Sequence, residues 1–263
     1  MIGAEELMTT NTQTRARTNK DLEAQPIRPK PGKKLFWPIA FYRTSVGKKW
    51  AMALSGIALM GFVFVHMVGN LKMYLGPEDI NHYGEFLRDM GEPIFPRTVL
   101  LWIMRIGLIG AFALHFHAAY ALTIQNRQAR AKGFQYQSKR DYIAASFASR
   151  TMRWGGIIIL LFLIWHLADL TWGWFNPDFI RGEVYHNVEA SLSRWPVTIL
   201  YVVANVALGF HLSHGAWSIF QSLGINNPKY NEARRWFARG FATIVVLGNI
   251  SFPVAVQLGI VGS

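Results

Sequence analysis

Five long apolar runs, almost free of charge, alternate with polar segments along this chain of 263 residues. A bilayer span needs about 20 mainly apolar residues, so each run predicts a transmembrane helix. The expected spans are 50–74, 98–124, 153–175, 196–222 and 240–262. Buried helices of a water-soluble core explain these runs poorly, because the usual soluble helix has about 11–12 residues. The predicted fold class is an all-α integral membrane protein, a bundle of five transmembrane helices.

The composition supports this interpretation and removes several kinds of chemistry. Hydrophobic residues make up 51% of the chain and charged residues only 16%, whereas soluble domains carry about 25% charged residues. The chain has no cysteine. Disulfides, cysteine nucleophiles, thiolate zinc sites, cysteine-ligated iron–sulfur clusters and covalently attached c-type haem are therefore excluded.

The charges between the spans give the topology. Basic residues prevail before the first span, between the second and third spans and between the fourth and fifth, whereas acidic residues prevail in the other two loops. Basic loops stay in the cytoplasm, which predicts the N-terminus inside and the C-terminus outside. The net charge of +12 then reports on membrane orientation, and no nucleic-acid partner is expected. Residues 1–44 are predicted to form a basic cytoplasmic tail, partly flexible, and residues 45–263 the membrane domain.

Histidines inside the spans are the candidate chemistry, because polar groups in a membrane are costly and usually face the bundle interior. Six of the eight histidines lie in the spans: His66, His115, His117, His166, His211 and His214. With the predicted orientation, those of the first and third spans lie at an outer level, and those of the second and fourth spans at an inner level. Two facing histidines at one depth can ligate a haem iron from both sides. Two such levels predict two stacked b haems.

The inner level leaves a choice of ligands open. His115 and His117 point about 200° apart on a helix of 3.6 residues per turn, so one of them competes with the other. His211 and His214 share roughly one face of the fourth span. Small residues near the histidines, such as Gly69 after His66, leave room for a porphyrin, although they also serve plain helix packing. Ala113, Ala121 and Gly215 are the other small residues of this kind.

Arg105 and Asp169 are the charges expected deepest in the membrane. An unpaired charge at such depth costs roughly 2.5–3.5 kcal/mol. We therefore expect these two side chains to meet each other, a haem propionate, or both. Asp169 is alternatively a contact for a quinone on the outer side.

Five stretches resemble a known family. They are Ser45-Val-Gly-Lys-Lys-Trp-Ala-Met-Ala-Leu-Ser-Gly-Ile, Val65-His-Met-Val-Gly-Asn-Leu, His117-Ala-Ala-Tyr, Ile164-Trp-His-Leu and Phe210-His-Leu-Ser-His-Gly-Ala-Trp-Ser. The last is the most specific. Together they span about residues 45–223 and resemble the single-chain, five-helix, two-haem membrane anchor of succinate dehydrogenase and fumarate reductase.

The resemblance implies a set of sites, cofactors and partners. The haem ligands fall on four positions, paired as His117 with His211 inside and His66 with His166 outside. A flavoprotein subunit and an iron–sulfur subunit dock on the cytoplasmic face and deliver electrons to membrane quinone, which this type of anchor indicates to be menaquinone. Ser45, Lys49 and His214 near the inner face are candidate contacts for the quinone. The chain itself has no flavin or dicarboxylate site, so it acts only within the complex.

Two rival classes share some of these features. A haem-b subunit of a hydrogenase or formate dehydrogenase also places histidines in membrane helices, but lacks the Phe-His-Leu-Ser-His-Gly-x-Trp-Ser stretch. A histidine-box di-iron enzyme, such as a desaturase, gathers its ligands at the cytoplasmic face. Here the histidines are spread through the membrane.

Overall fold

The computed structural model describes residues 36–128 and 147–262. The expected tail up to residue 35, and most of the basic loop between the second and third spans, lie outside the described residues. Contacts divide the chain into two compact units, residues 1–40 and 41–263. Helix α2 (Trp37–Arg43) begins in the first unit and ends in the second. The elements below all belong to the second unit.

Five helices in the described residues are long and apolar enough to cross a membrane, which confirms the predicted spans in number. They are α3 (Ser45–Asn70), α5 (Val99–Gln128), α6 (Phe147–Leu170), α8 (Trp195–Ser222) and α9 (Asn231–Gln257). In the most apolar 18-residue stretch of each span, at most a third of the residues are buried, and in α5 none are. Their large apolar side chains thus remain exposed along the helices, as contact with lipid requires. The chain is an integral membrane protein with five spans.

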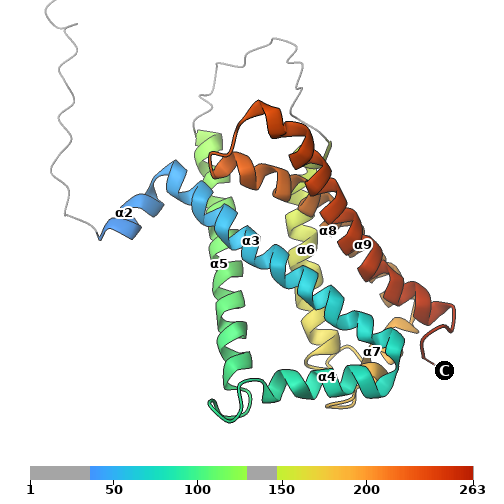
Figure 1. The fold of residues 1–263 in the computed structure, drawn as a ribbon. Helices are drawn as coiled ribbons and strands as arrows, with labels where there is room; N and C mark the ends of the chain where they lie inside the picture. Colours follow the sequence, from blue (N-terminus) through green and yellow to red (C-terminus); the bar gives the residue numbers. More distant parts are fainter. Residues whose placement is uncertain (1–35, 129–146, 263) are drawn as a thin grey trace, which may run out of the picture. The chain divides into compact units, whose positions relative to one another are not determined.

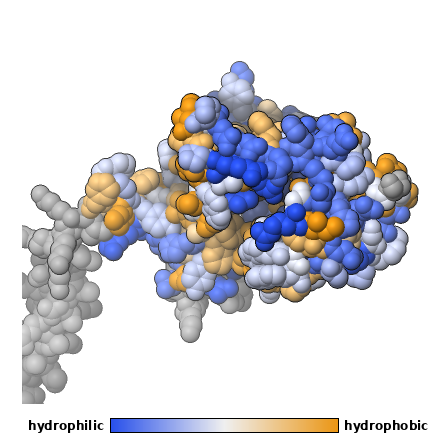
Figure 2. Space-filling view, turned by 90° about the horizontal axis from the view of Figure 1, so that it is seen from below, coloured by the Kyte–Doolittle hydropathy of each residue, from blue (hydrophilic) through white to orange (hydrophobic). Residues whose placement is uncertain are grey.

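Two short helices cover one end of the bundle (Figure 1). They are α4 (Pro77–Asp89), which follows the 3₁₀ turn η1 (Leu71–Leu75), and α7 (Val184–Leu192). The amide of Asn81 joins them, because its nitrogen donates to Glu183 Oε2 at 2.8 Å and its oxygen accepts from the backbone N–H of Tyr185 at 3.1 Å. Viewed from this end, hydrophilic residues cover much of the surface (Figure 2). The polar loops predicted on one side of the membrane therefore form a folded polar cap.

The fifth span differs from the sequence prediction in its bounds. Helix α9 begins at Asn231, after the 3₁₀ turn η2 (Pro228–Tyr230), and not near residue 240. All but one of the basic residues that indicated a loop lie on this helical extension. One of them, Arg234, is buried, and its guanidinium donates to the backbone carbonyls of Ile225 and Tyr230. The helix therefore extends through this charged segment, where Arg234 binds the preceding turn.

Helices α8 and α9 lie side by side in the second unit (Figure 1). Leu212 of α8 and Val245 of α9 belong to one buried apolar cluster. A methyl group placed on Gly209 would come within 2.5 Å of Val246 Cγ2, so glycine is what permits this close approach. The tight packing holds α8, which carries His211, in a fixed position within the bundle.

Candidate functional site

Two histidines from different spans face each other near the α4–α7 end. The rings of His66 on α3 and His166 on α6 have centroids 5.9 Å apart and lie nearly perpendicular, at 86°. With a metal–imidazole nitrogen distance of about 2.0–2.1 Å, two rings that share one metal have centroids roughly 6 Å apart. The amide nitrogen of Asn70 lies 3.4 Å from His66 Nε2, and because an amide nitrogen only donates, Nε2 is an acceptor with a lone pair. We call His66 and His166 the outer pair, after the level at which the sequence predicts them.

A second pair, called the inner pair below, lies farther from the α4–α7 end. In this pair His211 has a different partner from the one that the resemblance implies. His211 of α8 faces His115 of α5, with ring centroids 6.4 Å apart and an interplanar angle of 60°. The Nδ1 atom of His115 lies 3.1 Å from the backbone oxygen of Met52 on α3, so its N–H donates to that carbonyl. The described structure thus brings His115, and not His117, next to His211.

His117 points away from His211 because it lies about 200° around the helix from His115. It stacks on Tyr42, with ring centroids 5.7 Å apart, and a hydrogen bond joins its Nδ1 to the Tyr42 hydroxyl. Partial burial raises the pKa of the Tyr42 phenol above its ordinary value, so this group remains a neutral hydroxyl at physiological pH. Each of the two histidines on α5 therefore has its own polar partner.

Glycines border the inner pair. A Cβ atom on Gly56 of α3 would lie 3.4 Å from Cε1 of His115, and one on Gly156 of α6 would lie 3.7 Å from Cε1 of His211. A Cβ atom at either position would be in van der Waals contact with an imidazole, and glycine leaves that side clear. Gly69, expected to leave room beside His66, instead packs against Tyr83, since a Cβ there would lie 2.8 Å from that ring.

The two pairs occupy separate depths. Gly56 borders the inner pair and His66 belongs to the outer pair, and both lie on α3. The same holds for Gly156 and His166 on α6. With a rise of 1.5 Å per residue, each helix separates the two levels by about 15 Å. Two helices thus give the same spacing independently.

The donor set suits an iron that brings its own equatorial ligands. Within residues 36–128 and 147–262, no group of three or more histidine, aspartate or glutamate side chains could hold a bare metal ion. Paired imidazoles would instead supply two ligands to an iron whose other ligands come from a porphyrin. The residues present therefore fit haem b at both levels.

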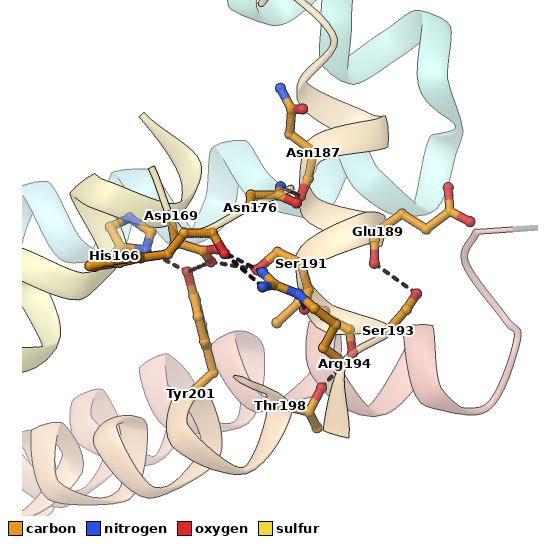
Figure 3. A network of polar contacts seen from close by, with 12 residues as sticks. His166, Asp169, Asn176, Asn187, Glu189, Ser191, Ser193, Arg194, Thr198 and Tyr201 are labelled. Atoms are coloured by element: carbon orange, nitrogen blue, oxygen red, sulfur yellow. Dashed lines mark hydrogen bonds and ion pairs between the residues drawn. The ribbon is translucent and has the colours of Figure 1, made fainter. Parts of the chain in front are cut away.

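A buried polar network adjoins the outer pair (Figure 3). The carboxylate of Asp169 at the end of α6 is fully buried. Its Oδ1 accepts from Arg194 Nη2 at 2.9 Å, and its Oδ2 accepts from the hydroxyls of Ser191 and, at 3.0 Å, Tyr201. The Tyr201 oxygen also lies 3.3 Å from Nδ1 of His166. The network thus reaches from the polar cap to a histidine of the outer pair.

The expectation that Arg105 meets Asp169 is wrong. Arg105 is exposed and lies over the ring of Trp102, 5.1 Å from its centroid, while Asp169 forms its ion pair with Arg194. Arg194 immediately precedes α8, and it also donates from Nη1 to the backbone oxygen of Phe175 at 2.6 Å. This second anchor holds the guanidinium beside the end of α6.

The candidate quinone contacts lie apart from this network. Ser45 donates to Gln125 Oε1 at 3.3 Å, and Lys49 is exposed in the first turns of α3. His214 is half-buried on α8. Among the described residues, no hydrogen bond joins His214 to Ser45 or Lys49.

Sequence reasoning missed three members of the network. In the sequence, Arg194 is one of several charges in a loop, and Ser191 is a polar residue of the same segment. Tyr201 is one aromatic residue within an uncharged run. A signal was present only for Arg194, which immediately precedes an apolar run. Tyr201 carries no pattern that separates it from a packing residue.

These features define a five-span integral membrane protein that places paired histidines at two depths. The family description "Succinate dehydrogenase/Fumarate reductase transmembrane subunit" matches residues 126–250. The succinate dehydrogenase cytochrome b558 subunit of Bacillus subtilis (strain 168) is 26% identical over 175 residues, which cover 66% of this chain and 77% of that protein. No solved structure matches the chain. Residues 126–250 thus match the succinate dehydrogenase/fumarate reductase transmembrane subunit family, and the chain is a distant homologue of that cytochrome b558 subunit.

Proposed function

We propose that this chain is the dihaem cytochrome b anchor of a succinate:quinone oxidoreductase. It passes electrons between a docked iron–sulfur subunit and membrane quinone, and a flavoprotein subunit handles the dicarboxylate. The observation that carries the proposal is the pair of facing histidines at each of two depths, about 15 Å apart on both α3 and α6. Similarity to the succinate dehydrogenase cytochrome b558 subunit of Bacillus subtilis supports it.

The outer haem is proposed to lie between His66 and His166. When bound, haem accepts and releases single electrons, and the protein holds it and tunes it. His66 would offer the Nε2 lone pair, which the Asn70 amide contacts at 3.4 Å and would release to the iron. His166 has its Nδ1 on the Tyr201 hydroxyl, which leaves Nε2 for the iron. Aromatic rings of Phe62 and Phe162 border the two imidazoles.

The inner haem is proposed to use His211 of α8 and His117 of α5. The choice of His117 rests on the resemblance of the His-Ala-Ala-Tyr stretch. The contact of its Nδ1 with Tyr42 would leave Nε2 free as a ligand. His115 is the alternative that the geometry favours, because it faces His211 and donates from Nδ1 to a carbonyl, as ligating histidines do. Ligation by His117 would require α5 to turn about its axis against its packing on α3.

The partners are proposed to dock on the cytoplasmic side, which carries the N-terminus and the end of the bundle opposite α4 and α7. Basic residues such as Lys229, Arg235 and Arg239 border a pocket at the start of α9 and suit an acidic partner surface. Ser45, Lys49 and His214 remain the proposed contacts for a quinone, which is menaquinone by the type of anchor. On the outer side, Asp169 and Arg105 remain proposed propionate or quinone contacts.

Co-purification with a spectroscopic readout tests this function. The tagged chain, isolated from its own cells in mild detergent, should bring a flavoprotein and an iron–sulfur protein, and succinate should reduce its haem. A nickel or molybdenum partner would support the rival hydrogenase or formate dehydrogenase function. A matched pair of variants completes the test. His211→Ala should lose the inner haem. His186 lies on α7 outside the spans and bonds to the Asp178 carbonyl, so His186→Ala should keep both haems.

A further inference from the structure

Tyr201 links a buried carboxylate to a histidine of the outer pair (Figure 3). Its hydroxyl donates to Asp169 Oδ2 at 3.0 Å, and its oxygen lies 3.3 Å from His166 Nδ1. A phenol has one proton to donate and an oxygen that also accepts. The direction of the second contact therefore depends on where that proton goes.

The surroundings of Asp169 determine where the Tyr201 proton goes. The carboxylate forms an ion pair with Arg194, so it is ionised and can only accept hydrogen bonds. Ser191 and Tyr201 both donate to its Oδ2. The proton of Tyr201 is thus committed to Asp169, and His166 must carry a proton on Nδ1 and donate it to the Tyr201 oxygen. This tautomer leaves the Nε2 lone pair of His166 available.

Burial strengthens the chain of hydrogen bonds. Asp169 and Ser191 have no exposed surface, and Tyr201 is 7% exposed. Where water is excluded, hydrogen bonds are electrostatically stronger and polarise one another. Arg194 balances the charge, so the carboxylate can remain at this depth. Tyr201 is further fixed by the edge of Phe162, whose ring centroid lies 5.0 Å away.

We propose that Tyr201 is a positioning residue that fixes the tautomer of His166 and, backed by Asp169, increases electron donation from that imidazole to the outer haem iron. The proposal rests on the proposed haem function. A carboxylate-backed partner on the distal N–H makes a histidine ligand more basic. A more basic ligand stabilises ferric iron. The chain of hydrogen bonds from Asp169 through Tyr201 to His166, called the relay below, therefore lowers the midpoint potential of the outer haem. The proposed inner ligand His117 has its Nδ1 on the Tyr42 hydroxyl, and among the described residues no carboxylate bonds to that phenol, so the two levels differ.

The test is a redox titration of the purified complex carrying Tyr201→Phe. This change removes one oxygen and keeps the ring. The reduced-to-oxidised ratio of the outer haem at fixed ambient potential should rise about tenfold, which is about 59 mV for one electron. The inner haem should not shift. The outer haem is identified as the one lost in His66→Ala.

Thr198→Val is the matched control. Thr198 is a buried hydroxyl residue one turn earlier on α8, and it donates to the Leu192 carbonyl rather than to the relay. Both potentials should stay unchanged in this variant. If Thr198→Val shifts the outer haem as much as Tyr201→Phe does, the effect is general loosening of α8 and the inference is overturned.

A second variant decides the matter if Tyr201→Phe does not retain the outer haem. The double variant Asp169→Asn, Arg194→Gln keeps the net charge and weakens the acceptor of the Tyr201 proton. It should shift the outer haem upward by a smaller factor than the phenylalanine variant. If Tyr201→Phe retains the outer haem, unchanged potentials in that variant overturn the role of Tyr201. If it does not, unchanged potentials in the double variant do so, and in both cases the haem function stands. Wild-type protein without haem would instead overturn the proposed function itself.

Discussion

The ion pair between Asp169 and Arg194 should be the most strongly coupled pair of charges in the membrane part of this chain. Removing one partner of a buried pair costs about 3–5 kcal/mol, because the other charge is left buried without compensation. Asp169 is fully buried but the Arg194 side chain is 31% exposed, so Arg194→Met should cost close to the lower limit, about 3 kcal/mol. The double variant Asp169→Asn, Arg194→Met leaves no orphan charge and should recover part of this loss.

A double-mutant cycle gives the coupling directly. We expect about 2–3 kcal/mol between Asp169 and Arg194, at the upper end for groups in one network. Arg105→Met is the control, because Arg105 only lies over Trp102. It should cost about 0.5–1 kcal/mol and couple to Asp169 by less than about 0.5 kcal/mol.

The assay is unfolding of the purified chain in mixed micelles by increasing SDS, followed by tryptophan fluorescence and circular dichroism. All four corners of each cycle are measured under identical detergent conditions. A coupling of Asp169 to Arg105 that equals or exceeds its coupling to Arg194 would refute the described network.

Three further predictions concern the inner ligands, the topology and helix packing. His117→Ala should lower the haem content by one per chain and His115→Ala should leave it unchanged; the reverse result would assign the inner iron to His115. The chain has no native cysteine, so Glu78→Cys should react with an impermeant maleimide from outside the cell, and Lys229→Cys only after permeabilisation; the opposite pattern would invert the topology. Gly209→Leu should destabilise the chain by about 1–3 kcal/mol through overpacking in an SDS titration, because even a methyl group there meets α9; an unchanged transition would contradict the close approach.

The spans and the histidine levels could be predicted from the sequence for one reason. Depth along a helix is a linear function of residue number, so hydropathy and charge place His66 and His166 at one level without any knowledge of neighbours. The start of the fifth span was less predictable, because the helix begins within a basic segment whose buried Arg234 binds a preceding turn.

Which side chains meet across helices could not be predicted in the same way. Rotation about the helix axis decides whether His115 or His117 faces His211, and rotation is set by packing against other helices rather than by position in the sequence. Arg194 could not be assigned to Asp169 for a related reason. Its place beside α6 depends on how the loop after that helix folds, including the carbonyl of Phe175 that holds the guanidinium.

Haem stoichiometry tests the central claim most directly. The complex is purified in mild detergent, haem b is measured by the pyridine haemochrome spectrum, and the chain is quantified by amino-acid analysis. Two facing histidine pairs at two depths predict two b haems per chain, with no covalently attached haem. A value near zero would contradict the cytochrome function, and a value near one would mean that only one of the two histidine levels holds an iron.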